Sequence, residues 1–383
     1  MRKITAILIL LFAVLAANSQ EYSAKSDTTT LEALPPSVVI IGKDTLNKSD
    51  KRYWKKALIK GKLNFKDTAV VYPRFIKFCV GVYNWCDKVF NTYDTAYVKG
   101  TGKRWKLFLR NENWLDSYAM NIGNGTYMTM ASIPSSTIGA HISYMALSVG
   151  YSYSIGKIFN YKQGACKNFG FQFTCALFAA EFYHSTNNGG TIIRKFKYPG
   201  GAYYNIDLPG LQLKSYGADA YFFFNNKKYS HAAAYCYSKI QKKSAGSLIA
   251  GVTLSRQSVG VDLSSAPKEI IEHLPEGAKV YNYRYNDFCL LFGYGYNWVF
   301  HKNWLLNGCA MPSAGLKYSF PDSVEGERYL FSTNIKAKLS ITGNTNRFFY
   351  GLIGRFDGHW YKSKGESFFN SILFLTLNLG FRF

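Results

Sequence analysis

Residues 287–300 read DFCLLFGYGYNWVF and alternate strictly between two kinds of side chain. One set is bulky and mostly aromatic, and consists of Phe288, Leu290, Phe292, Tyr294, Tyr296, Trp298 and Phe300. The other set is smaller on average, and consists of Cys289, Leu291, Gly293, Gly295, Asn297 and Val299. Successive side chains of a β-strand point to opposite faces, so this period of two predicts a strand. A long run of bulky residues on one face is typical of a strand that contacts lipid.

The last three predicted strands, at 329–340, 347–360 and 373–383, alternate in the same way but carry charges between the bulky residues. A charge that points into lipid costs roughly 2–4 kcal/mol at mid-depth, so we expect the charged face to point inward. The residues predicted to line the lumen are Lys336, Lys338, Arg347, Arg355, Asp357, His359 and Arg382. They fit an ion-pair network that fills a narrow barrel, and they also fit an anion-selective constriction.

The start of the chain predicts export. Arg2 and Lys3 precede an apolar run from Ile4 to Ala16, and Ala17-Asn18-Ser19 then supplies the small residues of a cleavage site. This pattern predicts a secretory signal peptide over residues 1–19. No later apolar run is long enough to span a membrane as a helix, and only helices and closed barrels satisfy their backbone in lipid. We therefore expect a bacterial outer-membrane barrel in an exported chain.

Composition narrows the choice of partners. The formal net charge is +23, but the basic residues are scattered and the chain is predicted to be exported, so nucleic acid is not expected. A basic lumen, or contacts with anionic lipid head groups and lipopolysaccharide, account better for the charge. The seven cysteines form no CxxC pair, and neither a P-loop nor a dinucleotide fingerprint occurs, so no cofactor and no metal site are predicted.

The remaining pattern predicts the organisation of the chain. A helix over about 74–90 follows Pro73 and carries an apolar stripe, which packs on the domain, lies on the membrane rim or partly plugs the pore. It belongs to an N-terminal periplasmic extension at 20–100, before an antiparallel barrel at 101–383. We expect about 12 strands, within roughly 10 to 14, and Thr191–Leu213 is the ambiguous stretch. Asn225-Asn226 predicts a two-residue hairpin turn, and Gln241–Ser247 predicts a polar loop.

The chain ends on an aromatic residue, Phe383, which is in phase with the outward face of the last predicted strand. A terminal aromatic of this kind resembles the C-terminal signal of bacterial outer-membrane barrels. The resemblance implies that the barrel assembly machinery recognises Phe383. The sequence leaves other protein partners open.

Five stretches carry a resemblance to a family: Tyr72–Phe75, Asn91–Val98, Gly100–Trp105, Phe224–Ser230 and Gln241–Ser247. Together they resemble domain-of-unknown-function family 4421, and the resemblance covers nearly all of the chain after the signal peptide. It implies a Gram-negative outer-membrane barrel from Bacteroidetes with a short helical region before it. The resemblance brings no activity with it.

Three functions are compatible with these features. The first is a small anion-preferring channel, and the second is a structural or assembly component of an envelope complex with a filled lumen. The third is a lipid-modifying enzyme, because the spacing of His141 and Ser143 resembles that of lipid A deacylases. Both side chains fall on the face opposite Ile142, which is the lumen face and points away from acyl chains. We therefore expect no enzymatic activity.

Overall fold

The computed structural model describes residues 38–383, apart from 42–43, 49, 51–52, 60–62, 104, 145–146, 160–165, 188–189, 209–210, 265, 275–278, 321–327 and 363–366. The predicted signal peptide at residues 1–19 lies outside the described residues. The chain divides into two compact units, Met1–Asn91 and Thr92–Phe383. The residues from Thr92 to Gly100, which were predicted as part of the extension, therefore belong to the second unit.

Among its described residues, the first unit contains a small hairpin and two helices. Its elements are β1 (Val38–Ile41), which pairs antiparallel with β2 (Asp44–Asn47), then α2 (Tyr53–Ile59) and α3 (Arg74–Asn91). The face of α3 that packs carries Ile76, Val80 and Tyr83, whereas Phe75 and Phe78 are exposed. The predicted helix is present, and within the first unit it packs through Ile76, Val80 and Tyr83 rather than through Phe75 and Phe78.

The second unit is almost entirely β-structure. Its first half contains β3 (Val98–Gly100), β4 (Trp105–Gly123), β5 (Thr126–Ser132), β6 (Ser135–Tyr144), β7 (Leu147–Ser154), α4 (Ile155–Phe159), β8 (Cys166–Thr174), β9 (Phe178–Asn187), β10 (Thr191–Tyr198), β11 (Gly201–Leu208) and β12 (Leu211–Phe223). Its second half contains α5 (His231–Tyr235), β13 (Lys239–Gln241), β14 (Ala245–Asp262), α6 (Lys268–Ile271), β15 (Val280–His301), β16 (Trp304–Ser319), β17 (Tyr329–Asn344), β18 (Phe348–Lys362) and β19 (Ser367–Arg382).

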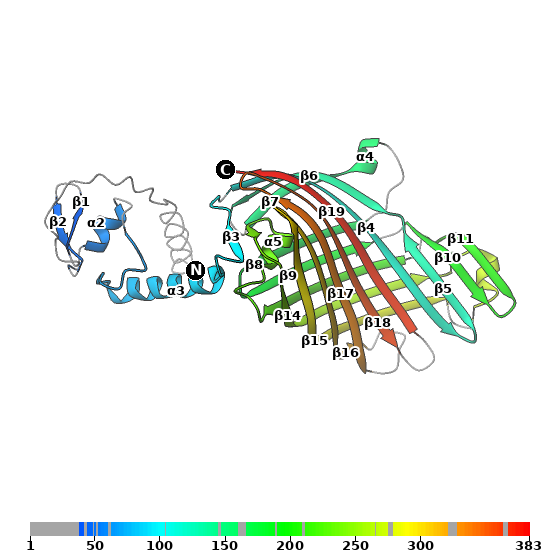
Figure 1. Cartoon of the computed structure of the whole chain (residues 1–383). Coiled ribbons are helices and arrows are strands. Elements are labelled where there is room, and N and C mark those ends of the chain that lie inside the picture. The colour runs from blue at the N-terminus through cyan, green and yellow to red at the C-terminus, as the bar shows by residue number, and fades with distance from the viewer. Residues whose placement is uncertain are drawn as a thin grey trace. The chain divides into compact units, whose positions relative to one another are not determined.

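In the described part of the chain, fifteen strands form one antiparallel sheet, which curls round on itself (Figure 1). Strands β14 to β19 pair in chain order, and β19 then pairs with β4, so the last strand lies beside the first long one. Three short breaks separate β5 from β6, β9 from β10 and β11 from β12. Among the described residues the sheet thus has fifteen strands, more than the roughly 10 to 14 expected from the sequence. No ladder joins β7 to β8 among the described residues.

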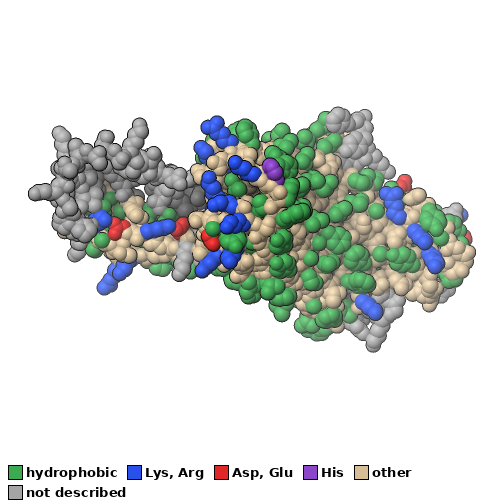
Figure 2. All heavy atoms as spheres, in the orientation of Figure 1, with side chains coloured by type: hydrophobic (Ala, Val, Ile, Leu, Met, Phe, Trp, Pro, Cys, Tyr) green, Lys and Arg blue, Asp and Glu red, His purple; other side chains and the backbone are tan. Residues whose placement is uncertain are grey.

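The two faces of the sheet match the predicted alternation. On β15, Phe288, Leu290 and Trp298 are exposed, whereas Cys289 and Leu291 are buried inside the curl. Similar residues on the neighbouring strands make a broad apolar band around the outside (Figure 2). An apolar outer band over a polar interior is what a strand wall in lipid requires. The second unit is therefore a transmembrane antiparallel β-barrel of the outer-membrane type, as the sequence predicts.

The barrel has two unlike ends. The turn end carries the short connections at 302–303 and 345–347 and the terminal Phe383. The loop end carries longer connections, including the one that holds α6. Outer-membrane barrels have short turns on the periplasmic side and longer loops on the opposite side. No helix among the described residues is long and apolar enough to cross a membrane.

Candidate functional site

A twenty-residue segment between β12 and β14 folds into the turn end of the barrel. We name residues 225–244 the plug. They contain α5 and β13, and the side chains from Tyr229 to Tyr235 are almost all fully buried. The prediction of a two-residue hairpin turn at Asn225-Asn226 is therefore wrong, as is that of a polar loop beginning at Gln241, which is buried in β13. The chain turns inward because the interior supplies partners for the plug.

A second segment lies along the plug and immediately precedes the first barrel strand. We name residues 92–103 the strap. Its strand β3 pairs antiparallel with β13 of the plug. The Asp94 amide donates to the carbonyl oxygen of Lys227 at 2.8 Å, and the Lys242 amide donates to that of Tyr97 at 2.6 Å. Strap and plug therefore form one folded body, and four of the five family-like stretches lie mainly within it.

Two cations from barrel strands hold the middle of the plug. The Lys106 Nζ of β4 donates to the carbonyl oxygen of Cys236 at 2.9 Å. The Arg382 Nε and Nη2 of β19 donate to the carbonyl oxygen of Tyr237 at 3.0 and 2.6 Å, and its Nη1 donates to that of Thr345 at 2.6 Å. Tyr237 has a φ of 56°, which a tyrosine adopts only where its surroundings enforce it. Neither cation forms an ion pair within the described residues.

One buried amide, that of Gln241, joins both ends of the plug to the wall. Its Oε1 accepts from the Ser230 amide and from Asn297 Nδ2 of β15, each at 3.0 Å. Its Nε2 donates to the carbonyl oxygens of Lys228 at 2.6 Å and Lys243 at 2.9 Å. Because all four contacts use a single side chain, Gln241 fixes the entry and the exit of the plug against each other.

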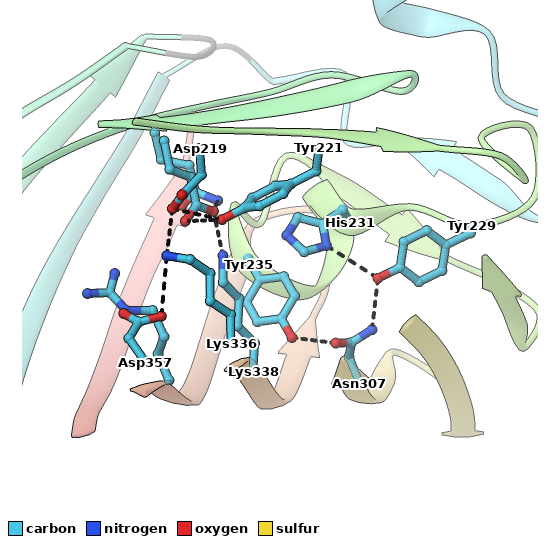
Figure 3. Close-up of polar contacts among 12 residues, drawn as sticks. Asp219, Tyr221, Tyr229, His231, Tyr235, Asn307, Lys336, Lys338 and Asp357 are labelled. Atoms are coloured by element: carbon cyan, nitrogen blue, oxygen red, sulfur yellow. Dashed lines mark hydrogen bonds and ion pairs between the residues drawn. The ribbon is translucent and has the colours of Figure 1, made fainter. Parts of the chain in front are cut away.

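Aromatic side chains of the plug reach the wall at close range. Asn307 of β16 accepts a hydrogen bond from the Tyr235 hydroxyl and donates to the Tyr229 hydroxyl at 3.3 Å (Figure 3). The same Tyr229 hydroxyl lies 3.3 Å from His231 Nδ1. A Cβ at Gly295 of β15 would come within 2.6 Å of the Tyr229 hydroxyl oxygen, so glycine makes room for this ring.

Between the plug and the loop end, the lumen holds a network of buried ion pairs. Lys336 Nζ lies 2.7 Å from Asp219 Oδ2 of β12 and 3.6 Å from Asp357 Oδ1 of β18 (Figure 3). Arg355 Nε lies 2.9 Å from the other oxygen of Asp357. The Lys336 ammonium therefore lies between two carboxylates from strands that are far apart in the sheet. Such a pair stabilises only while both partners are present, because a lone buried charge is costly.

Further pairs extend this network. Lys338 Nζ lies 2.5 Å from Glu181 Oε1 of β9, and the Tyr221 hydroxyl donates to Glu181 Oε2 at 3.2 Å. Lys317 of β16 and Asp287 of β15 are fully buried, with 3.9 Å between Nζ and Oδ2. Lys336–Asp219 and Lys338–Glu181 thus join strands that are distant in the sheet, whereas Lys317–Asp287 joins two neighbouring strands.

The predicted lumen residues divide into three groups. Lys336, Lys338, Asp357, His359 and Arg382 are buried inside the barrel, and Arg355 is partly exposed there. Arg382 belongs to the plug contacts rather than to the network. Arg347 does not line the lumen: it is exposed in the turn before β18, where strand alternation no longer applies.

Sequence reasoning missed the carboxylates that pair with these cations. Glu181, Asp219 and Asp287 were not assigned to the lumen, nor was Lys317, although Asp219, Asp287 and Lys317 are buried within it and the Glu181 side chain is 12% exposed. A signal was present, because Asp219 lies between Ala218 and Ala220 in an alternating strand. A single charge among apolar residues on a predicted strand is best explained by an inward position.

His141 and Ser143 share the inner face of β6, as expected. The His141 Nε2 is 3.3 Å from the Ser152 Oγ of β7, and its ring stacks on Phe108 with 5.3 Å between centroids. The structure thus gives His141 a contact with Ser152 rather than with Ser143. In the described part of the chain, no group of three or more His, Cys, Asp or Glu side chains is placed to hold a metal ion.

The stability of the plug should depend on pH through His231. Burial, and next the Lys338 charge, lower the pKa of this histidine to about 3. The unfolded chain, with a pKa of about 6.5, binds the proton first, so stability should fall as the pH drops from about 6.5 towards 3. Replacement of His231 by Gln removes this contribution. Urea unfolding of both proteins at several pH values should show a shallower acid slope for the variant, by up to about 1.4 kcal/mol per pH unit. Equal slopes would contradict the assignment.

The model of one protein family, described as "Domain of unknown function (DUF4421)", matches residues 92–383. Among curated proteins, none matches the chain. A solved structure titled "Bacterial polysaccharide outer membrane secretin" is 8% identical with a TM-score of 0.28, over 73% of this chain and 99% of that one. The outer membrane protein OprG from Pseudomonas aeruginosa is 10% identical with a TM-score of 0.24, over 73% of this chain and 97% of that one. OmpT of Vibrio cholerae is 6% identical with a TM-score of 0.25, over 72% of this chain and 98% of that one.

These TM-scores are low, and the fold is assigned from the strands and their register alone. The family match is different, because it covers most of the chain. Its first residue, Thr92, is also the first residue of the strap and of the second compact unit. The match therefore covers the strap, the plug and the barrel together, and the chain belongs to the DUF4421 family.

Proposed function

We propose that the protein is an outer-membrane barrel with a closed lumen and a structural role, as a membrane component on which an envelope assembly forms. This proposal is supported by side chains that fill the barrel interior from the turn end to the loop end. The plug occupies the turn end, the ion pairs of Lys336 and Lys338 occupy the middle, and an apolar core occupies the loop end. That core contains Tyr118, Met120, Ile193, Phe196, Leu211, Val261, Tyr283 and Phe368, among others.

The charges of the lumen favour a filled interior over an anion-selective constriction. Lys336 and Lys338 lie 2.7 and 2.5 Å from carboxylate oxygens, so their charges are compensated. Separating one buried pair costs about 3–5 kcal/mol when a charge is left unpaired. An open pore through this layer would break several pairs at once. This cost is difficult to meet without a partner that takes over the contacts.

The proposal predicts electrical silence. The refolded protein, reconstituted into a planar bilayer with asymmetric salt, should give no steady current. Heat-modifiable migration on a gel would show that the silent protein is folded. A steady anion-selective current from the unmodified protein would contradict a closed lumen and would support the channel instead.

One observation favours a second candidate, an anion-preferring channel that opens when the plug moves. Lys106 and Arg382 contact carbonyl oxygens of the plug and make no ion pair among the described residues. If the plug moved away, both positive charges would face the lumen. The same bilayer recording on an Arg382→Ala variant, which keeps the Lys106 charge, tests this candidate: anion-selective current in the variant alone would support a pore that the plug closes.

A further inference from the structure

The outward side of the strap and plug is strongly basic. Lys99, Lys103, Lys227, Lys228, Lys242 and Lys243 are exposed there. Asp94 is the one acidic residue in the sequence of the strap and plug. In Figure 2, Lys and Arg side chains gather at the end of the barrel beyond the apolar band. We name these six lysines the basic face.

Several lysines of the basic face are held in place by the surrounding structure. The ammonium groups of Lys228 and Lys243 lie 5.1 and 5.6 Å from the centroid of the Tyr97 ring. Lys242 Nζ donates to the carbonyl oxygen of Thr95 at 2.9 Å. Like charges gathered on one rigid support repel one another, and a bound anion relieves that repulsion. The basic face is thus already arranged to receive a polyanion.

The position of the basic face distinguishes between kinds of polyanion. The plug contacts β4 through Lys106, β15 through Asn297, β16 through Asn307 and β19 through Arg382, so it sits within the mouth of the barrel. Its exposed side therefore faces out of the mouth along the barrel axis. Lipid head groups surround the wall of a barrel and do not cover its mouth. A soluble partner reaches this surface more readily than a lipid does.

We propose that the basic face docks an acidic segment of a soluble periplasmic protein. This inference rests on the proposed structural role and names the chemistry of the partner. Salt screens exposed ion pairs, so several of them together give an affinity that depends strongly on salt. The buried framework beneath the lysines keeps them in position while the partner binds.

Binding of a fluorescently labelled poly-glutamate peptide to the full chain, in uncharged detergent, tests the proposal. We expect binding that weakens as salt is added. Replacement of Lys227, Lys228, Lys242 and Lys243 by Gln should weaken it about tenfold or more. A matched control replaces the exposed lysines at or near the loop end, Lys197, Lys214, Lys268 and Lys279, by Gln and removes the same charge. The control should keep its affinity within about twofold.

Two outcomes would overturn the proposal. Equal weakening in both variants would mean that only net charge matters. The second outcome is an unmodified protein that retains anionic phospholipid but does not bind poly-glutamate. If replacement of Lys227, Lys228, Lys242 and Lys243 by Gln then removed that phospholipid, the basic face would be assigned to lipid. The proposal of a closed lumen can fail separately. A protein that conducts ions but still binds poly-glutamate through these lysines would contradict the closed lumen and leave the docking surface intact.

Discussion

Replacement of Lys336 by Met should destabilise the barrel by about 3–5 kcal/mol, the largest effect we expect from one substitution. Methionine keeps much of the side-chain volume but leaves Asp219 and Asp357 facing each other without the ammonium between them. Both carboxylates are buried, so water cannot compensate fully. Urea unfolding in detergent micelles, followed by tryptophan fluorescence, measures the change.

Two comparisons separate the ion pair from other effects of the substitution. Lys214→Met changes an exposed lysine and should alter stability by less than about 0.5 kcal/mol. The double variant Lys336→Met with Asp219→Asn should recover part of the loss, because one unpaired charge is removed. A loss below about 1 kcal/mol for Lys336→Met would show that the network does not hold the lumen closed.

Replacement of Arg382 by Ala should release the plug without unfolding the barrel. The arginine donates to the carbonyl oxygens of Tyr237 and Thr345 and to Asn344 Oδ1. Hydrogen bonds from a charged group contribute about 1.5–3 kcal/mol each, so a loss of about 3 kcal/mol is expected locally. This corresponds to roughly a hundredfold increase in the opening of the plug. Hydrogen exchange of the amides in residues 225–244 measures it directly.

Arg347→Ala is the matched control, because Arg347 is also an arginine near the turn end but is exposed. It should leave exchange in the plug unchanged. Faster exchange across the whole barrel in the Arg382 variant would mean that this residue supports the entire fold. Unchanged exchange within the plug would mean that Gln241 and the strap are sufficient to hold it.

The barrel itself could be predicted because its signal is local. In β15 every second residue is bulky over the full apolar band, and lipid imposes that period on each strand independently of its neighbours. The position of the ambiguous stretch 191–213 could not be fixed, since it holds β10, β11 and the start of β12 in strands interrupted by breaks. There the alternation restarts more than once.

The plug could not be predicted because its partners are remote in sequence. Asn225-Asn226 has the composition of a tight turn, and nothing near it indicates that the chain goes inward. The segment becomes buried through Asn297, Asn307 and Arg382, which lie on strands much later in the chain. The two arginines illustrate the same limit: alternation places Arg382 correctly within a strand but fails for Arg347, just outside one.

The contacts of the lumen also set an order for biogenesis. Asp219 and Lys336 are separated by 117 residues, and Glu181 and Lys338 by 157. The plug also needs its contacts with Lys106, which is 130 residues before Cys236, and with Arg382, which is 145 residues after Tyr237. Contacts this distant form late, after the entropy of closing long loops has been overcome. The plug can therefore reach its final position only as the first and last strands meet, and Asp219 and Glu181 lack their lysine partners until the distant strand β17 is in place.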